Sequence, residues 1–428
     1  MLKPSLTDLH IFQGLSVQIQ VQNLLQETIS LWWECENNGY PEMPSYSGQT
    51  KLANEKLLDH FIHTLSQHAS RPPKTPAEIQ TVRQEITTQY SSLASSIVGL
   101  EESQLEFIKA SGLVEALVEF TRMARRFDPQ ISSEDIYQAG RNVMTMNLLQ
   151  LLMNLPVQIS PAVFAYSMLY PYSDNYLDDP SIAGRTKLTF GEHFKRRLNG
   201  ELLEPVNARE QTIFDLIGMV EGQFERGLYP QVYQSLNAIQ DAQSKSLKLL
   251  RTNTSPYDTD VLGIVFEKGG TAVLADGYLV AGLLSPAEAH FMFTYGAFTQ
   301  LMDDLEDVRQ DMKDGIMTLF SHSARYWPLD GLTNRTFAMG QKLFNRLDCF
   351  DSPAREPIKQ ILQKSINPLL IVSASGLGPY YSRRYLAELE GHLPFHYSFL
   401  SKQRKKIERQ KTALTRLVEI LLLRAKVD

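Results

Sequence analysis

The chain has 428 residues and a net charge of −6, with 43% hydrophobic and 21% charged residues. This balance is ordinary for a globular protein and excludes global disorder. The two cysteines, Cys35 and Cys349, cannot form a disulfide framework and favour a reducing compartment. We expect a cytoplasmic protein, because the first residues lack a signal-peptide pattern and no window holds ~18 uninterrupted apolar residues.

Helix signals recur along the chain, whereas alternating strand patterns around Asn-Gly or Asp-Gly turns are missing. Thr75 to Glu78 and Ser285 to Glu288 each combine an N-cap, a proline at the first helical position and a glutamate that closes a capping box. We therefore expect an all-α fold. The periodic segments predict helices over residues 15–37, 50–70, 76–98, 101–127, 132–154, 160–179, 206–250, 257–282, 285–314, 331–374 and 394–425.

Two breaks in these patterns bear on the organisation of the chain. Residues 71–76 are the one convincing linker, so we expect an N-terminal helical extension over 1–75 and the main α-helical domain over 76–428. Pro171 lies inside the segment 160–179 and predicts a kink or a restart of that helix.

The helix predicted over 285–314 carries the sharpest chemical signal. At 100° per residue, its polar side chains share one face about 100° wide. Like charges one turn apart repel, and Arg309 and Lys313 lie on other faces and do not compensate them. A solvated surface face fits these angles equally well, but a divalent cation would relieve the repulsion, because Mg²⁺ takes oxygen ligands. The face consists of Gln300, Asp303, Asp304, Asp307 and Asp311.

A second acidic cluster follows an aromatic and apolar segment at residues 160–172. Asp174 and Asp178 are one turn apart on one face. Two acidic helices, each preceded by apolar sequence, suit the ionisation of a diphosphate ester. Ions held from both sides would neutralise the leaving group as its C–O bond breaks, and an apolar cavity would protect the allylic cation from water.

Five blocks in this order resemble the isoprenoid synthase superfamily, and more closely the bacterial large (class IB) terpene synthases of the tetraprenyl-β-curcumene synthase type. The resemblance covers residues 130–330 well and is more specific for fold and diphosphate ionisation than for product. It implies an isoprenoid synthase-type helical bundle around a central hydrophobic cavity, three Mg²⁺ ions and a long linear polyprenyl diphosphate substrate. The blocks are DNYLD at 174–178, FERGLYPQVYQSL at 224–236, AQSKSL at 242–247, EKGGTAVLADGYLVAG at 267–282 and YGAFTQLMDDLEDVRQD at 295–311.

The resemblance also assigns roles to individual aspartates. Asp174 and Asp178 match the first aspartate-rich motif of the family, and Asp303, Asp304 and Asp307 match the second. All five are expected Mg²⁺ ligands, and all but Asp304 form the expected catalytic set. Members commonly have a further aspartate one turn before the first motif, where this chain has proline, so the number of ions held by the first helix is open.

Three polar residues are candidate diphosphate contacts. Lys268 precedes Gly269 and Gly270, which are expected to loosen the helix and let the backbone approach a ligand. A surface lysine is the alternative for Lys268, a salt bridge for Arg141 and packing for Gln300. Aromatic faces stabilise cations, so four aromatics are candidates to line the cavity, with ordinary core packing as the alternative: Phe164, Tyr170, Tyr295 and Phe298.

The charge is unevenly spread along the chain. Residues 402–428 contain nine Lys or Arg and three acidic residues, a local charge of +6, which leaves −12 for the remainder. We expect no nucleic-acid partner, because the motifs lie in the acidic part. The basic segment is a candidate for peripheral contact with an anionic membrane, with a packed terminal helix or the contact of a homodimer as alternatives.

The expected activity is that of a Mg²⁺-dependent class I terpene synthase. It would ionise a polyprenyl diphosphate and end in deprotonation or cyclisation to a terpene hydrocarbon or alcohol. Three alternatives remain open. A chain-elongating prenyltransferase would use a basic GKRxRP-like motif, which is not found here. Head-to-head condensation is loosely suggested by the Q-x-x-D pattern at 300–303 together with Asp307 and Asp311. A catalytically silent scaffold would have kept only the fold.

Overall fold

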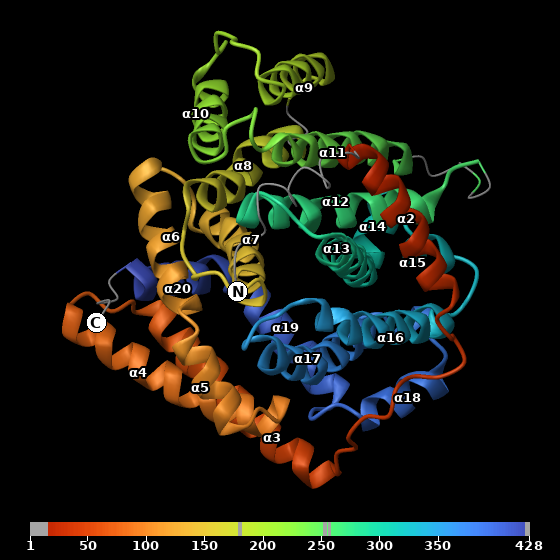
Figure 1. Ribbon diagram of the computed structural model, residues 1–428. Helices are drawn as coiled ribbons and strands as arrows, with labels where there is room; N and C mark the ends of the chain where they lie inside the picture. Colours follow the sequence, from red (N-terminus) through yellow and green to blue (C-terminus); the bar gives the residue numbers. More distant parts are fainter. Residues whose placement is uncertain (1–15, 179–181, 251–254, 256–257, 424–428) are drawn as a thin grey trace.

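The computed structural model describes residues 16–178, 182–250, 255 and 258–423, except for the side chains of 174, 175, 177, 178 and 184 (Figure 1). All regular structure in these residues is helical, and no strand occurs among them. The expected all-α class is therefore confirmed. None of the described helices combines the length and the apolarity that crossing a bilayer requires.

Two consecutive helices lie in the middle of the molecule. α12 (Val261–Ala281) is almost wholly apolar and buried along most of its length. It packs against α13 (Pro286–Glu306), which starts at the predicted capping box of Ser285 and Glu288. Figure 1 shows the pair between an upper and a lower group of helices. Apolar side chains of both helices contribute to two core clusters, so the pair separates the two cores.

The upper core packs around α7, α8, α10 and α11, with α6 and α9 at its edge (Figure 1). Their bounds are α6 Leu113–Phe127, α7 Ser133–Leu152, α8 Pro161–Asp178, α9 Gly184–Leu198, α10 Ala208–Gln223 and α11 Pro230–Ser246, followed by a 3₁₀ turn at Leu247–Leu249.

The lower core packs around α16 and α17, with α18 and two short helices beside them. Their bounds are α14 Val308–Asp314, α15 Leu319–Ser323, α16 Asp330–Phe344, α17 Arg355–Ser375 and α18 Arg383–Gly391, with 3₁₀ turns at Asn345–Cys349 and Gly378–Tyr380.

The N-terminal and C-terminal helices are joined to this body. α2 contributes Leu24 to the upper core and Trp32 to the lower one. α20 packs against α7, α3 and α6. The domain boundary at residue 75 stays a prediction, although α2 shares both cores with the main domain. The bounds are α2 Val17–Trp33, α3 Gly48–Ser70, α4 Pro76–Leu93 with a π-helical turn at Ala94–Val98, α5 Glu102–Ala110, α19 Tyr397–Glu408 and α20 Lys411–Leu423.

The structure corrects several predicted helices. The segment 101–127 breaks at Gly112, which adopts a left-handed conformation with φ 77°. The predicted restart at Pro171 is wrong, because α8 continues through this residue to Asp178. The predicted loosening at Gly269 and Gly270 is also wrong, because α12 is continuous there. Among the described residues, the helices α9, α15 and α18 lie outside the predicted segments.

Candidate active site

The acidic face predicted on the helix 285–314 has an exposed edge and a buried edge. The side chains of Asp303 and Asp307 are exposed, whereas Asp304 is 5% and Asp311 8% exposed. The helix is interrupted at Asp307, which is both the C-cap of α13 and the N-cap of α14. Two carboxylates therefore reach solvent, while two others are surrounded by protein.

The buried edge holds carboxyl groups that are easily protonated. Gln300 donates from Nε2 to Oδ1 of Asp304 at 2.9 Å, while Oδ2 is buried without a hydrogen-bond partner among the described residues. Burial raises the pKa of Asp304 to about 7. Burial and the charge of Asp307 raise the pKa of Asp311 to about 6, and Thr318 donates from Oγ1 to this carboxyl at 3.4 Å.

Two basic residues from other helices approach the exposed edge. Although Asp303 reaches solvent, desolvation by the surrounding protein raises its pKa, and the positive charges of Arg141 and Lys268 oppose that shift. The same two charges oppose the raised pKa of Asp307. The structure thus brings together α7, α12 and α13, and with them two predicted diphosphate contacts and two predicted metal ligands. Gln300, the third predicted contact, packs against Asp304.

The first acidic cluster lies at the C-terminal end of α8. The side chains of Asp174 and Asp178 are outside the described part of the structure, so their relation to Asp303 stays a prediction. No group of three metal-binding side chains occurs among the residues whose side chains are described. The exposed carboxylates of α13 therefore supply at most one half of the predicted donor set.

The four predicted cavity aromatics do not gather in one cluster. Phe164 is 2% exposed and belongs to the upper core. Phe298 is fully buried in the lower core, against which Tyr295 also packs. Tyr170 is 45% exposed. Burial of Phe164 and Phe298 agrees with the core-packing alternative, and their role in lining a cavity stays a prediction.

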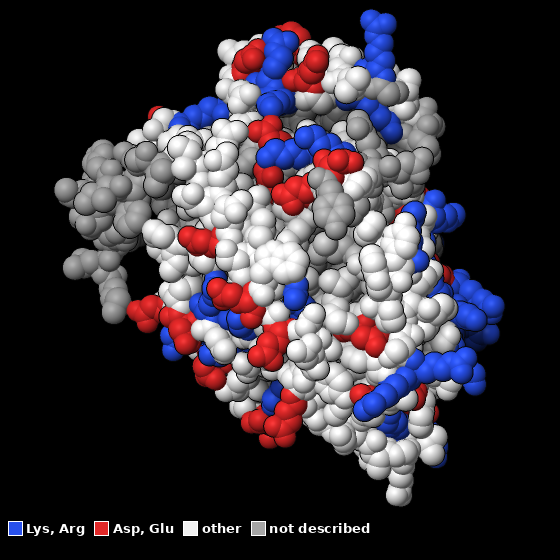
Figure 2. Space-filling view, turned by 90° about the vertical axis from the view of Figure 1, so that its right-hand side faces the viewer, with Lys and Arg blue, Asp and Glu red and all other residues white. Residues whose placement is uncertain are grey.

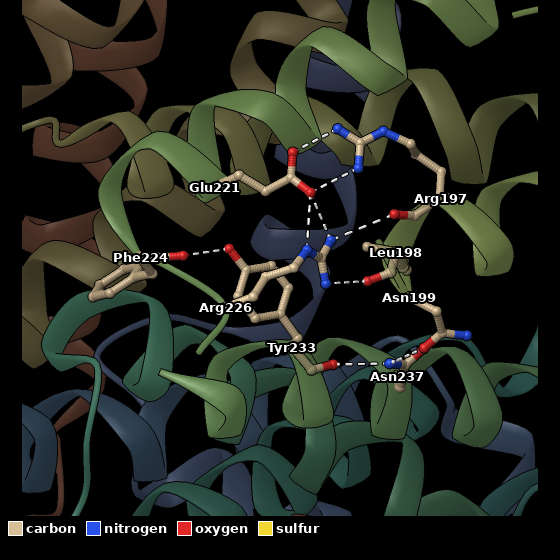
Figure 3. A network of polar contacts seen from close by, with 8 residues as sticks. All are labelled: Arg197, Leu198, Asn199, Glu221, Phe224, Arg226, Tyr233 and Asn237. Carbon is tan, nitrogen blue, oxygen red and sulfur yellow. Dashed lines mark hydrogen bonds and ion pairs between the residues drawn. The ribbon is translucent and has the colours of Figure 1, made fainter. Parts of the chain in front are cut away.

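A polar network that sequence reasoning missed fixes α9, the helix that follows the first acidic cluster (Figure 3). Arg197 of α9 donates to Glu221 of α10 from both terminal guanidinium nitrogens, Nη1 and Nη2, at 2.7 and 2.5 Å. Arg226 donates to the same carboxylate at 2.8 Å and lies 3.8 Å from the ring centroid of Tyr233 on α11. The available signal was the position of Arg226 and Tyr233 inside the block 224–236.

The basic segment is described up to residue 423. Lys402 and Lys405 of α19 and its C-cap residue Arg409 are exposed, and Lys406 lies 3.6 Å from Asp59 of α3. The next helix, α20, is anchored through Glu419, which accepts from Arg125 Nε at 3.0 Å. On the face shown in Figure 2, Lys and Arg side chains gather along the right-hand edge. A packed terminal helix is thus observed for α20, while the membrane contact stays a prediction.

Comparison with known proteins adds no family assignment. No family model matches the chain, and a search of curated proteins finds no relative.

Proposed function

We propose that the chain is a class I terpene synthase. It binds a linear polyprenyl diphosphate with Mg²⁺, ionises the C–O bond and converts the allylic cation by deprotonation or cyclisation. The observation that carries the proposal is that the charges of Arg141 and Lys268, from two other helices, act on the exposed carboxylates of Asp303 and Asp307 and oppose the rise in their pKa values. Cations near carboxylates, on helices that are otherwise largely apolar, suit a ligand with a highly charged head and an apolar tail.

The residues of α13 fit a magnesium site in their donor chemistry. Asp303 and Asp307 present carboxylate oxygens to solvent, and Asp304 has a buried Oδ2 without a described partner. Oxygen ligands of this kind suit Mg²⁺, which would neutralise the leaving diphosphate when bound. Asp174 and Asp178 would complete the donor set from α8. The number of ions, three by resemblance, belongs to the proposal.

The basic residues have a separate task in this mechanism. When the C–O bond breaks, its electron pair leaves with the diphosphate oxygen, and negative charge grows on the leaving group. Arg141 and Lys268 would stabilise that charge, which is supported by the effect of their positive charges on the neighbouring Asp303 and Asp307. Four aromatic side chains are proposed to help exclude water from the allylic cation, because aromatic faces stabilise cations. They are Phe164, Tyr170, Tyr295 and Phe298.

The test is the release of pyrophosphate from prenyl diphosphates of different chain lengths, with and without Mg²⁺. Removal of the charges in Asp303→Asn and Asp307→Asn should lower Mg²⁺-dependent release on the order of 10²-fold or more. Glu306→Gln is the matched control, since Glu306 is an exposed acidic neighbour on the same helix but off the predicted face. Wild-type rates in both aspartate variants, or an equal loss in the control, would refute the assignment.

Product analysis separates the proposal from its alternatives. A chain-elongating prenyltransferase would form longer diphosphates when isopentenyl diphosphate is added, and head-to-head condensation would give a product with twice the carbon number of the substrate. A silent scaffold would show no Mg²⁺-dependent thermal stabilisation by a diphosphate analogue. A terpene hydrocarbon or alcohol of unchanged carbon number supports the synthase.

A further inference from the structure

The largely apolar helix α12 carries a carboxyl group that is separate from the acidic face of α13. The side chain of Asp276 is 2% exposed, and its α12 neighbours Leu274 and Leu279 belong to the upper core. Burial raises the pKa of Asp276 well above its ordinary value, because a buried site disfavours the charged carboxylate. Burying a polar group in apolar surroundings is costly, and such carboxyl groups are often functional.

Asp276 connects three helices through one side-chain amide. Asn142 of α7 donates from Nδ2 to Oδ1 of Asp276 at 3.3 Å. The same Nδ2 lies 3.2 Å from Oγ of Ser167 on α8, and Ser167 is fully buried. These polar groups join α7, α8 and α12 within packing that is otherwise largely apolar.

The same three helices carry the basic residues and the first acidic cluster of the proposed site. Arg141 directly precedes Asn142 on α7, and it lies close enough to Asp303 to oppose the rise in its pKa. Apolar neighbours such as Val143, which is fully buried, hold a helix in place without a strong directional preference, whereas hydrogen bonds are directional. Consider a guanidinium group that lies about 9 Å from the axis of α7. If the helix rotated by about 10°, this group would move by about 1.5 Å.

We infer that Asp276 is a positioning residue: its contact with Asn142 fixes the rotation of α7 so that Arg141 faces the diphosphate beside Asp303. The inference rests on the proposed function, which supplies the diphosphate. Reacting groups that are misplaced by about 1 Å lose on the order of 10² in rate. The contact between Asp276 and Asn142 therefore affects the reaction without touching the substrate.

The first test compares three variants of the full chain. Asp276→Leu and Asn142→Ala each remove the contact, and each should lower both kcat/KM and the calorimetric affinity for inorganic pyrophosphate with Mg²⁺ by about 10- to 100-fold. Asp276→Asn keeps an acceptor oxygen for Asn142 and should stay within about threefold of wild type. If the leucine variant fails to fold, Asn142→Ala tests the same contact from the other helix.

The second test asks whether the effect passes through Arg141. In an Arg141→Gln background, Asn142→Ala should cause a further loss of at most about twofold, because the group that it positions is gone. If Asn142→Ala lowered activity by the same factor in the Arg141→Gln background as in the wild-type background, its role would be generally structural. That result would overturn the inference. Loss of activity in Asp276→Asn equal to that in the leucine variant would also overturn it, since it would indicate proton transfer by the carboxyl group.

Failure of this inference can be distinguished from failure of the proposed function. If the wild-type protein neither releases nor binds pyrophosphate with Mg²⁺, both are wrong. If the wild-type protein does bind, two results would show that only the positioning role is wrong. The first is that Arg141→Gln does not weaken binding, and the second is that Asn142→Ala and Asp276→Leu leave binding unchanged.

Discussion

The backbones of Gly269 on α12 and Gly296 on α13 are in contact, with no room for a side chain between them. A Cβ atom at Gly269 would lie 2.3 Å from the carbonyl oxygen of Gly296, and a Cβ atom at Gly296 would lie 2.1 Å from the carbonyl oxygen of Gly269. This contact is one residue from Lys268 and about two turns before Asp303 on α13. It therefore sets how closely the cation of α12 approaches the carboxylates of α13.

Substitution at this crossing should weaken both stability and ligand binding. In Gly296→Ala the new methyl group would force the two helices apart, because the clashing atom is backbone oxygen that cannot rotate away. We expect the free energy of unfolding to fall by about 2–3 kcal/mol. The affinity for pyrophosphate with Mg²⁺ should fall as well, since Lys268 moves away from Asp303. Urea denaturation and calorimetry measure the two effects.

Gly218 offers the matched control for this prediction. It lies inside α10, and a Cβ atom there would meet nothing within 4 Å. Gly218→Ala should be neutral or stabilising by up to about 1 kcal/mol, because alanine favours the helix. Equal destabilisation by Gly218→Ala and Gly296→Ala would contradict a specific role for the α12–α13 contact.

The buried carboxyl groups of Asp304 and Asp311 predict an unusual pH dependence for the metal-free protein. Their pKa values, about 7 and about 6 when folded, exceed the value of about 3.9 expected when unfolded. The folded protein therefore binds more protons than the unfolded chain across this interval. Each group contributes stability that is complete below about pH 4 and lost as pH rises towards its folded pKa, at up to about 1.4 kcal/mol per pH unit.

Denaturation in EDTA between pH 5 and pH 8 measures this effect. Asp304→Asn should flatten the profile between pH 5 and pH 7, because the amide does not ionise. Added Mg²⁺ should stabilise the wild-type protein more at pH 8 than at pH 5, since protons compete with the metal for carboxylates. An unchanged pH profile in Asp304→Asn would contradict the buried, protonated state of Asp304.

The exposed cations of α19 lead to a prediction about membranes. If they contact an anionic surface, Lys402→Glu combined with Lys405→Glu should strongly reduce sedimentation with phosphatidylserine vesicles, because each basic residue near such a surface contributes about 1 kcal/mol. Neutral phosphatidylcholine vesicles should bind neither protein. Arg185→Glu combined with Lys187→Glu on α9 changes the net charge by the same amount and is the control for a general change of net charge. If the wild-type protein does not bind phosphatidylserine vesicles, the membrane contact is wrong and the exposed side of α19 is an ordinary solvated surface.

Local chemistry predicted some features of this fold well and others poorly. The capping boxes at Thr75 and Ser285 form as expected, because each depends on residues within one turn. α9 was missed, since its N-cap residue, Ala183, provides no side-chain hydrogen bond and the helix is anchored by the distant contact of Arg197 with Glu221. Burial divided the acidic face in a way that helical angles alone could not predict.

The network around Glu221 should contribute more to the free energy of unfolding than the exposed ion pair beside it. Arg197 and Arg226 lower the pKa of Glu221 through their hydrogen bonds, and the side chains of Arg197 and Glu221 are only 12% and 27% exposed. Glu221→Gln should cost about 2–3 kcal/mol at pH 7, because two partly buried guanidinium groups lose their anion. The control is Glu201→Gln in the pair with Arg196, whose side chains are 50% and 47% exposed and whose loss should leave the free energy of unfolding nearly unchanged.

The pH dependence of the Glu221 variant distinguishes ion pairing from packing. A glutamate with a lowered folded pKa stabilises the protein above its unfolded pKa of about 4.3, and this contribution is lost as pH falls through the folded value. Wild type and Glu221→Gln should therefore differ at pH 7 and converge in acid. Because α9 directly follows the first acidic cluster of α8, the variant should also weaken pyrophosphate binding at pH 7. A stability difference that stays constant down to pH 3 would indicate that packing, and not charge, accounts for the role of Glu221.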